Sequence, residues 1–177
     1  MMVVEKARRR VFKGKVTRVE EVDLDFGNGK QATYEVVKFK VITGVSALPI
    51  TKDGVILIKH YQAGLGRESY SLPTGGLNKG EDPKERMQQE LQEELGYKAG
   101  KLTIMLRAHP LPGYVGTEPG YLFLAEKLIK SKLKGDEDYD ISVHQFSWEQ
   151  VMGMVKRGEI IDTRTLVALL YYQRFYQ

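Results

Sequence analysis

Three glutamates within five residues have the spacing of a metal-binding helix face. Glu90, Glu93 and Glu94 stand at positions i, i+3 and i+4, which share one face of an α-helix, so their carboxylates converge. Such a cluster is mutually repulsive unless a cation neutralises it. The chain has no cysteine, and hard oxygen ligands favour Mg²⁺ or Mn²⁺ over zinc. The sequence therefore predicts a magnesium site, with manganese as the alternative, on a helix.

The residues that flank these glutamates predict a capped helix after a tight turn. Asp82 suits the N-cap position and Pro83 the first helical position. Gly96 is placed to end the helix, because a left-handed residue there favours glycine. One face then presents carboxylates to a cleft while another buries an apolar stripe that repeats every four residues, at Met87, Leu91 and Leu95.

An ordinary solvated helix face is the alternative interpretation of this acidic segment. On such a face, Lys84 and Arg86 would only balance the neighbouring acids. That interpretation explains neither the Leu-Pro-Thr-Gly-Gly turn at residues 72–76 nor the glycine at position 96. We therefore favour the metal site.

The stretch from Gly75 to Tyr97 closely resembles the Nudix box, in which glycine, glutamate, Arg-Glu, Glu-Glu and a second glycine recur at fixed spacing. One position departs from it, because Gln89 stands where the family has arginine. An amide offers only a neutral hydrogen bond, so we expect the glutamates to be oriented without the usual cation. The matching positions are Gly75, Glu81, Glu90, Leu91, Glu93, Glu94, Gly96 and Tyr97.

Length, charge and composition suit an enzyme of ordinary size. A chain of 177 residues suggests one domain with a small appendage, and the absence of cysteine suits a reducing cytoplasm. The sequence shows no apolar run typical of a signal peptide or a membrane span. The net charge is +4, and residues 1–40 hold ten Lys or Arg against six acids. That basic segment lacks a recognition helix, so we expect a soluble cytoplasmic protein that binds neither membrane nor nucleic acid.

Alternating apolar and polar residues predict an α/β fold with an N-terminal β-hairpin. In the hairpin, strands near 22–26 and 37–41 flank an Asn-Gly turn at 27–30. Ser147 opens a later helix with a capping box, and a last helix starts near Thr163. Further strands are expected at 45–49, 55–60, 102–108, 121–127 and 141–146.

The order of these elements resembles one branch of the Nudix superfamily, the ADP-ribose pyrophosphatases and nucleoside-diphosphate-sugar hydrolases. The resemblance covers most of the chain and includes the segments at 56–61, 72–75 and 81–83. It also includes Pro112, which lies 16 residues beyond Gly96 and marks ADP-ribose-type substrates in this branch.

This resemblance implies the fold, the domain organisation and the assembly. The fold is a Nudix α/β/α sandwich with a mixed sheet and an N-terminal antiparallel β-hairpin extension. The extension occupies residues 1–43 and the Nudix hydrolase domain residues 44–177. The resemblance further implies a homodimer in which the extension crosses to the partner and completes the substrate site.

The resemblance also implies roles for single residues. Glu90, Glu93 and Glu94 would bind the metal ion, with the backbone carbonyl of Thr74 as a further ligand, and Glu90 and Glu93 would also act in catalysis. Glu81 would reach this cluster through water or stabilise its own loop. The substrate would contact Gly75, Gly76, Arg67, Pro112, Gly113 and Glu118.

In this branch the general base comes from an acidic loop after the core strands. Residues 134–140 occupy that place, and we assign the base to Glu137, with Asp138 and Asp136 as the alternatives. A carboxylate beside a metal-bound water accepts its proton without a strongly shifted pKa. A plain solvated loop is the competing interpretation of this acidic run.

Two further departures concern the substrate. Ser71 replaces a glutamate that often precedes Leu-Pro in this branch, and Gln62 replaces the arginine of the usual Gln-Tyr-Arg pattern. Arg67 is close enough in sequence to substitute for that arginine. These changes question ADP-ribose as the preferred substrate more than they question hydrolysis.

The sequence thus predicts a Mg²⁺-dependent hydrolase that cleaves the pyrophosphate bond of a nucleoside diphosphate sugar, such as ADP-ribose or GDP-mannose. The products would be a nucleoside monophosphate and a sugar phosphate. Two alternatives stay open. One is a Nudix-like module that binds a nucleotide sugar without turnover, which Gln89 favours. The other is an RNA 5′-pyrophosphohydrolase, which the basic first segment favours.

Overall fold

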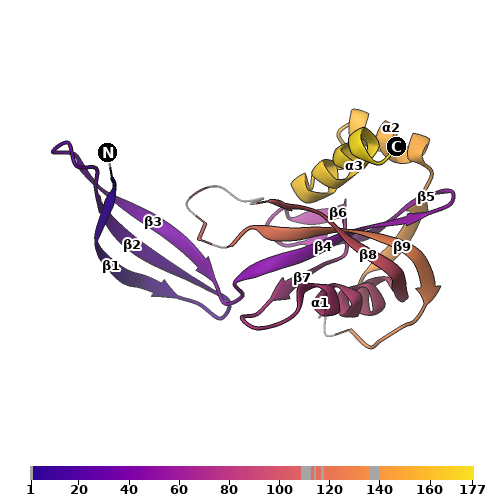
Figure 1. The fold of residues 1–177 in the computed structure, drawn as a ribbon, viewed down its shortest axis with the longest axis horizontal. Coiled ribbons are helices and arrows are strands. Elements are labelled where there is room, and N and C mark those ends of the chain that lie inside the picture. Colours follow the sequence, from indigo (N-terminus) through magenta and orange to yellow (C-terminus); the bar gives the residue numbers. More distant parts are fainter. Residues whose placement is uncertain (1, 109–112, 114, 117, 136–139) are drawn as a thin grey trace.

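The computed structural model describes residues 2–108, 113, 115–116, 118–135 and 140–177. Figure 1 shows a small antiparallel sheet at the N-terminus, set apart from a larger body in which helices lie on both sides of a mixed sheet. None of the described helices is long and apolar enough to cross a membrane.

The N-terminal extension is a three-stranded sheet in the order β1-β2-β3. Its strands are β1 (Val4–Lys13), β2 (Thr17–Asp25) and β3 (Gln31–Phe39). The turn between β2 and β3 is the predicted Asn-Gly turn, with Gly27 and Gly29 at φ of 72° and 78°. The predicted hairpin therefore forms, and a further strand, β1, pairs with β2 and becomes the edge of the sheet.

Ion pairs with β2 neutralise most of the basic run in β1. Arg8 donates to Glu20 at 2.8 Å, and Arg9 donates to Asp23 at 2.7 Å. Hydrogen bonds from Arg18 and Arg8 hold the pKa of the Glu20 carboxyl below its usual value. The arginines therefore stabilise strand pairing, which leaves less free positive charge for a polyanion.

The larger sheet has seven strands, with β10-β5-β4-β9-β8 as its main order, while β6 pairs with β5 and β7 pairs with β4. Strands β4 and β9 run parallel, and every other pairing is antiparallel. The sheet is therefore mixed, as the resemblance implied. Its strands are β4 (Thr43–Thr51), β5 (Gly54–Gln62), β6 (Arg67–Ser71), β7 (Thr74–Leu77), β8 (Tyr97–Ala108), β9 (Gly120–Lys130) and β10 (Ser142–Phe146).

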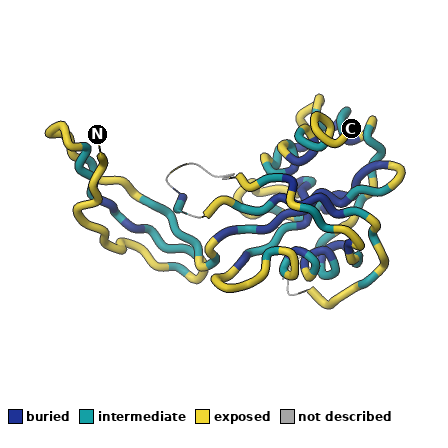
Figure 2. Tube along the Cα trace, viewed as in Figure 1, coloured by how far each residue is buried: buried dark blue, intermediate teal, exposed yellow. Residues whose placement is uncertain are grey.

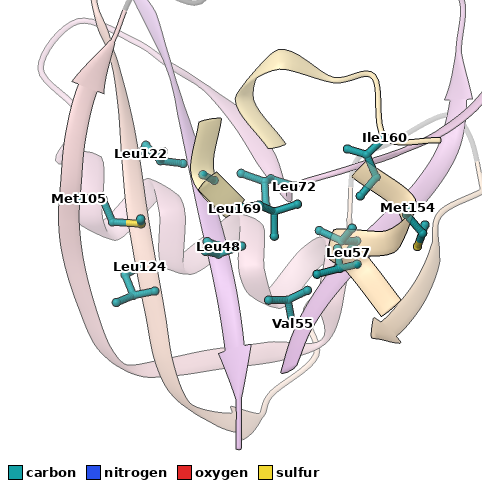
Figure 3. Close-up of a cluster of buried hydrophobic side chains, with 12 residues drawn as sticks. Leu48, Val55, Leu57, Leu72, Met105, Leu122, Leu124, Met154, Ile160 and Leu169 are labelled. Carbon is teal, nitrogen blue, oxygen red and sulfur yellow. The ribbon is translucent and has the colours of Figure 1, made fainter. Parts of the chain in front are cut away.

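Helices cover this sheet on both faces and enclose two apolar cores (Figure 1). On one face α1 (Pro83–Glu90) and the π-helical turn η1 (Leu91–Leu95) pack on the sheet. On the other face lie α2 (Trp148–Lys156) and α3 (Thr163–Phe175). Figure 3 shows the second core, where helix residues such as Leu169 meet sheet residues such as Leu48 and Leu122. This is the predicted three-layer α/β/α sandwich.

Burial differs sharply between the two parts of the chain (Figure 2). The strands and helices of the sandwich hold nearly all the buried side chains, whereas every residue of β1 is exposed. The extension therefore owes little of its stability to an apolar core of its own.

Candidate active site

The glutamates of the box lie where α1 passes into η1. Asp82 caps α1 by accepting hydrogen bonds from the N–H groups of Lys84 and Glu85, and Gly96 ends η1 in the left-handed conformation at φ 75°. Both predicted helix ends are thus present. The side chains of the predicted stripe are buried in the core beneath the helix: Met87, Leu91 and Leu95.

The three carboxylates at the π-helical turn differ in burial. The N–H of Gly96 donates to the carbonyl of Leu91, five residues back, so this turn holds more residues than an α-helical one. Glu90 and Glu94 are buried, at 2% and 4% exposure, while Glu93 is only partly buried. We expected the carboxylates to face a cleft, but Glu90 and Glu94 lie beneath the preceding turn.

That turn contacts both buried carboxylates through its backbone. The N–H of Thr74 donates to Glu94 Oε2 at 2.9 Å. Gly75 lies against Glu90 so closely that a Cβ at this position would stand 1.8 Å from Glu90 Oε1. A Cβ at Gly76 would stand 2.7 Å from Val41 Cγ1. The two glycines are therefore required by close approach, which explains the Gly-Gly sequence before the helix.

Arg86 provides a cation for this cluster. Its guanidinium forms an ion pair with Glu90 Oε1, donates from Nε to the carbonyl of Gly76 at 3.2 Å, and lies 3.9 Å from Glu93 Oε2. Gln89 donates from Nε2 to Glu93 Oε1 at 2.8 Å. The box position therefore gives Glu93 a neutral hydrogen bond, and a cation that the sequence did not predict reaches Glu90 from Arg86, one helical turn before it.

Glu81 stabilises its own loop. It accepts one hydrogen bond from the N–H of Asn78 at 2.7 Å and another from the Asn78 amide at 2.9 Å. These two bonds hold the pKa of the Glu81 carboxyl below its usual value. Of the two roles expected for Glu81, the structure shows the loop contact.

The N-terminus of α3 supports the turn from the other face of the sheet. Thr165 is fully buried; its hydroxyl accepts from the N–H of Leu72 at 3.1 Å and donates to Asp162 Oδ1 at 2.6 Å. Asp162 also caps α3 by accepting from the N–H of Thr165. A buried network therefore joins the helix cap to the residue two positions before Thr74.

A cavity of 660 Å³ opens beside the turn. Strands β4, β7, β8 and β9 line it, and the first turn of α3 closes one side. Its volume falls in the range of small-molecule sites. The polar and glycine residues on its wall include Thr43, Ser46, Thr74, Gly75, Gly76, Glu118, Asp162, Thr163 and Arg164.

Three of the predicted substrate residues line this cavity, and Gly113 is not among its wall residues. Gly75, Gly76 and Glu118 line its wall. The backbone of Glu118 is tied to the start of β4, since its carbonyl accepts from the Thr43 hydroxyl at 2.7 Å. Gly113 is an exposed turn residue with open space around it.

Arg67 and the expected base complete the predicted set. Arg67 is exposed on β6, directly opposite Gln62 on β5, and is not among the residues of the cavity wall. Ser71 is buried and lies 3.2 Å from His60 Nε2. Pro112, Glu137, Asp136 and Asp138 fall outside the described residues.

Sequence reasoning missed four polar residues of this region. Arg86 was considered only as a balancing surface charge, although it stands four residues before Glu90, which is ion-pair spacing on a helix. The other three residues lie at the start of α3: Asp162, Arg164 and Thr165. Asp162 is a recognisable N-cap residue, but nothing in one sequence indicates which turn of the sheet this helix end contacts. Contacts 93 residues apart, such as Leu72 with Thr165, require the fold.

The donor set suits a hard divalent cation. Two buried carboxylates, Glu90 and Glu94, lie on consecutive helical turns with Glu93 beside them, and oxygen donors of this kind bind Mg²⁺ or Mn²⁺. Among the residues that the structure describes, no three acidic or histidine side chains are grouped as ligands of one ion. The Arg86 guanidinium brings a positive charge to Glu90.

Two carboxylates are buried under a glycine turn, and the turn lines a cavity against the strands of a mixed sheet. This arrangement defines an α/β protein with a candidate divalent-metal site. A model of the NUDIX domain matches residues 40–169, and a model of the NudE-type Nudix hydrolase N-terminal domain matches residues 6–35. The chain therefore belongs to the Nudix hydrolase family, whose members generally use divalent metal ions.

Relatives with known names support this placement. The chain is 34% identical to an ADP-ribose pyrophosphatase of Bacillus subtilis over 94% of its own length and 90% of that protein. It is 31% identical to the ADP compounds hydrolase NudE of Escherichia coli, over 92% and 84%. A crystal structure of an ADP compounds hydrolase superimposes with a TM-score of 0.89, at 25% identity over 99% of this chain and 94% of that one. The fold predicted from the sequence is confirmed.

Proposed function

We propose that this protein hydrolyses the pyrophosphate bond of a nucleoside diphosphate sugar to a nucleoside monophosphate and a sugar phosphate. ADP-ribose is the first candidate, because two relatives are named for ADP-ribose and ADP compounds, and GDP-mannose is the second. The observation that carries the proposal is the burial of Glu90 and Glu94 beneath the Thr74–Gly75 turn. The residues of this turn line a cavity that is large enough for a small ligand.

Magnesium is the proposed cofactor, with manganese as a substitute. Glu90 and Glu94 would hold the ion, with Glu93 and the Thr74 carbonyl as further oxygen ligands. When bound, such an ion neutralises the pyrophosphate and lowers the pKa of a bound water. The chain's own part is to keep two carboxylates dehydrated and fixed, which the Thr74 N–H and the Arg86 guanidinium do.

The remaining assignments follow from the family pattern. Glu137 is the proposed general base, with Asp136 and Asp138 as alternatives, and Glu93 acts beside Glu90 in catalysis. For the substrate we propose contacts with Gly75, Gly76 and Glu118, which line the cavity, and with Pro112 and Gly113. Arg67 is proposed as a contact from β6, in place of the arginine missing at Gln62.

A homodimer through the N-terminal extension is the proposed assembly. Strand β1 is the outer edge of its sheet, and its apolar residues Val4, Val11 and Phe12 are exposed by 46%, 51% and 55%. An exposed apolar edge strand is a template for pairing with another chain. Light scattering after gel filtration should give about twice the chain mass of 20.1 kDa. The Val11→Asp variant should run as a monomer; a wild-type monomer would contradict the proposed assembly.

The two alternative functions now have less support. The non-catalytic module was favoured by the missing box arginine, and Arg86 supplies a cation to the same cluster. The RNA hydrolase was favoured by the basic segment, whose arginines pair with acids of β2.

A substrate panel tests the proposal. The protein is incubated with Mg²⁺ and, separately, ADP-ribose, GDP-mannose, UDP-glucose and 5′-triphosphorylated RNA, and released phosphomonoesters are assayed. We expect turnover of at least one sugar nucleotide and a loss of at least about 100-fold in Glu94→Gln, which removes a proposed ligand charge. Tight binding of a sugar nucleotide with no turnover would favour the non-catalytic module, and turnover of RNA alone would favour the RNA hydrolase.

A further inference from the structure

Arg86 and Gln89 divide between them the contacts that hold two glutamates of the box. Arg86 lies four residues before Glu90, and its side chain is 21% exposed where it meets a Glu90 side chain that is 3% exposed. Gln89 lies four residues before Glu93 and donates to it at 2.8 Å. Both pairs therefore use the i, i+4 spacing of one helix surface.

The three nitrogens of the Arg86 guanidinium face three different acceptors. Nη2 pairs with Glu90 Oε1, Nε donates to the carbonyl of Gly76, and Nη1 lies 3.9 Å from Glu93 Oε2. A planar fork of fixed geometry suits this arrangement, whereas the point charge of a lysine would not reach all three. The contact with Gly76 is important, because it anchors the guanidinium to β7 and not only to its own helix.

The contacts around Glu90 restrict its carboxylate from two sides. Gly75 lies within contact distance of the carboxylate on one side, since a Cβ there would overlap three atoms of the Glu90 side chain. Arg86 attracts Oε1 and is itself held by the next residue of the same turn. A buried carboxylate that is fixed in this way keeps its orientation without rearrangement when a ligand arrives.

We propose that Arg86 is the positioning residue of the metal site in this chain and replaces the arginine that the Nudix box has at position 89. It acts through Glu90, while Gln89 orients Glu93 with a neutral hydrogen bond. The inference rests on the proposed function insofar as Glu90 is a metal ligand. The new point is that the positively charged side chain can come from position 86, about one helical turn before the family position 89.

Four variants test this assignment against a purely structural role. Arg86→Gln removes the charge, and Arg86→Lys keeps the charge but loses the fork. Arg86→Gln combined with Gln89→Arg restores a cation at the family position, where residue 89 already reaches Glu93. The matched control is Lys84→Gln, which removes an exposed cation from the same helix. Mn²⁺ affinity is measured by electron paramagnetic resonance of the free ion, thermal unfolding is recorded without metal, and turnover of the best sugar nucleotide is assayed.

We expect Arg86→Gln to weaken Mn²⁺ binding by about 10- to 100-fold, the range for residues that orient metal ligands. Arg86→Lys should fall between it and the wild type, and the double variant should recover most of the lost affinity. Lys84→Gln should stay within about twofold of the wild type, as a surface substitution. If Arg86→Gln does not fold, Arg86→Lys and the double variant still give the comparison.

Unchanged or tighter Mn²⁺ binding by Arg86→Gln would overturn the proposal, and tighter binding would show that Arg86 competes with the ion. A double variant no better than Arg86→Gln would also overturn it. Metal affinity is measured without substrate. A wild type that turns over no sugar nucleotide would therefore refute the proposed substrate, whereas the Mn²⁺ affinities would still decide the role of Arg86.

Discussion

Replacing Gly75 by alanine should displace the Glu90 carboxylate. The added Cβ would stand 1.8 Å from Oε1, 2.3 Å from Cδ and 2.6 Å from Cγ of Glu90. Since nonbonded atoms need about 3.5 Å, the carboxylate or the turn must move by about 1.7 Å. Movement of the turn would also loosen the bond from the Thr74 N–H to Glu94. Either response disturbs a proposed metal ligand.

The expected cost falls mainly on catalysis. A misplacement of about 1 Å at a reacting centre costs on the order of 100-fold in rate, so Gly75→Ala should lower kcat by at least that factor. Its overpacking should reduce the free energy of unfolding by about 1–3 kcal/mol. The control is Gly64→Ala, because a Cβ at Gly64 would have no atom within 4 Å.

The assay compares kcat for the best sugar nucleotide with urea unfolding of the same preparations. We expect a folded Gly75→Ala variant with a large loss of kcat and a Gly64→Ala variant like the wild type. A folded Gly75→Ala variant with kcat within about threefold of the wild type would refute the placement of Glu90 at the catalytic centre.

Two further predictions concern stability. Thr165→Val should lower the free energy of unfolding by about 1–3 kcal/mol, because it leaves the buried N–H of Leu72 without its acceptor. Thr165→Ser should retain most of that stability in urea unfolding; equal stability of the valine variant would contradict the network. Glu20, whose pKa is lowered by Arg18 and then Arg8, contributes stability above its ordinary pKa of 4.5, and this contribution is lost as the pH falls through the lower folded value. The thermal midpoint of Glu20→Gln should therefore lie below that of the wild type at neutral pH and approach it in acid; a constant difference would contradict this linkage.

Much of the fold could be predicted because its signals are local. The Asn-Gly turn, the Asp82 cap and the left-handed Gly96 are determined by neighbours in the chain, and all three are present. The capping box of α2 at Ser147 and Gln150 also forms as expected. Two short strands were missed: β6 was not anticipated, and β7 was considered only as a turn. Neither has a periodicity of its own, and each is a strand because β5 or β4 lies beside it.

The site could be predicted only in part, because its chemistry depends on contacts distant in sequence. The box motif identified the glutamates, the glycines and the helix that carries them. It could not show that Glu90 and Glu94 are buried under the turn, that Arg86 meets both Glu90 and the carbonyl of Gly76, or that Thr165 supports Leu72. These contacts depend on how β7 and α3 pack, which one sequence does not encode in any local pattern.

Hydrolysis of ADP-ribose in ¹⁸O-labelled water is the most direct test of whether this protein cleaves a pyrophosphate bond with water. We expect two phosphomonoester products, adenosine monophosphate and a ribose phosphate, one of which carries a single labelled oxygen. We expect no product when the divalent ion is removed with a chelator. Release of free ribose, products without label, or undiminished turnover in the chelator would contradict the proposed function.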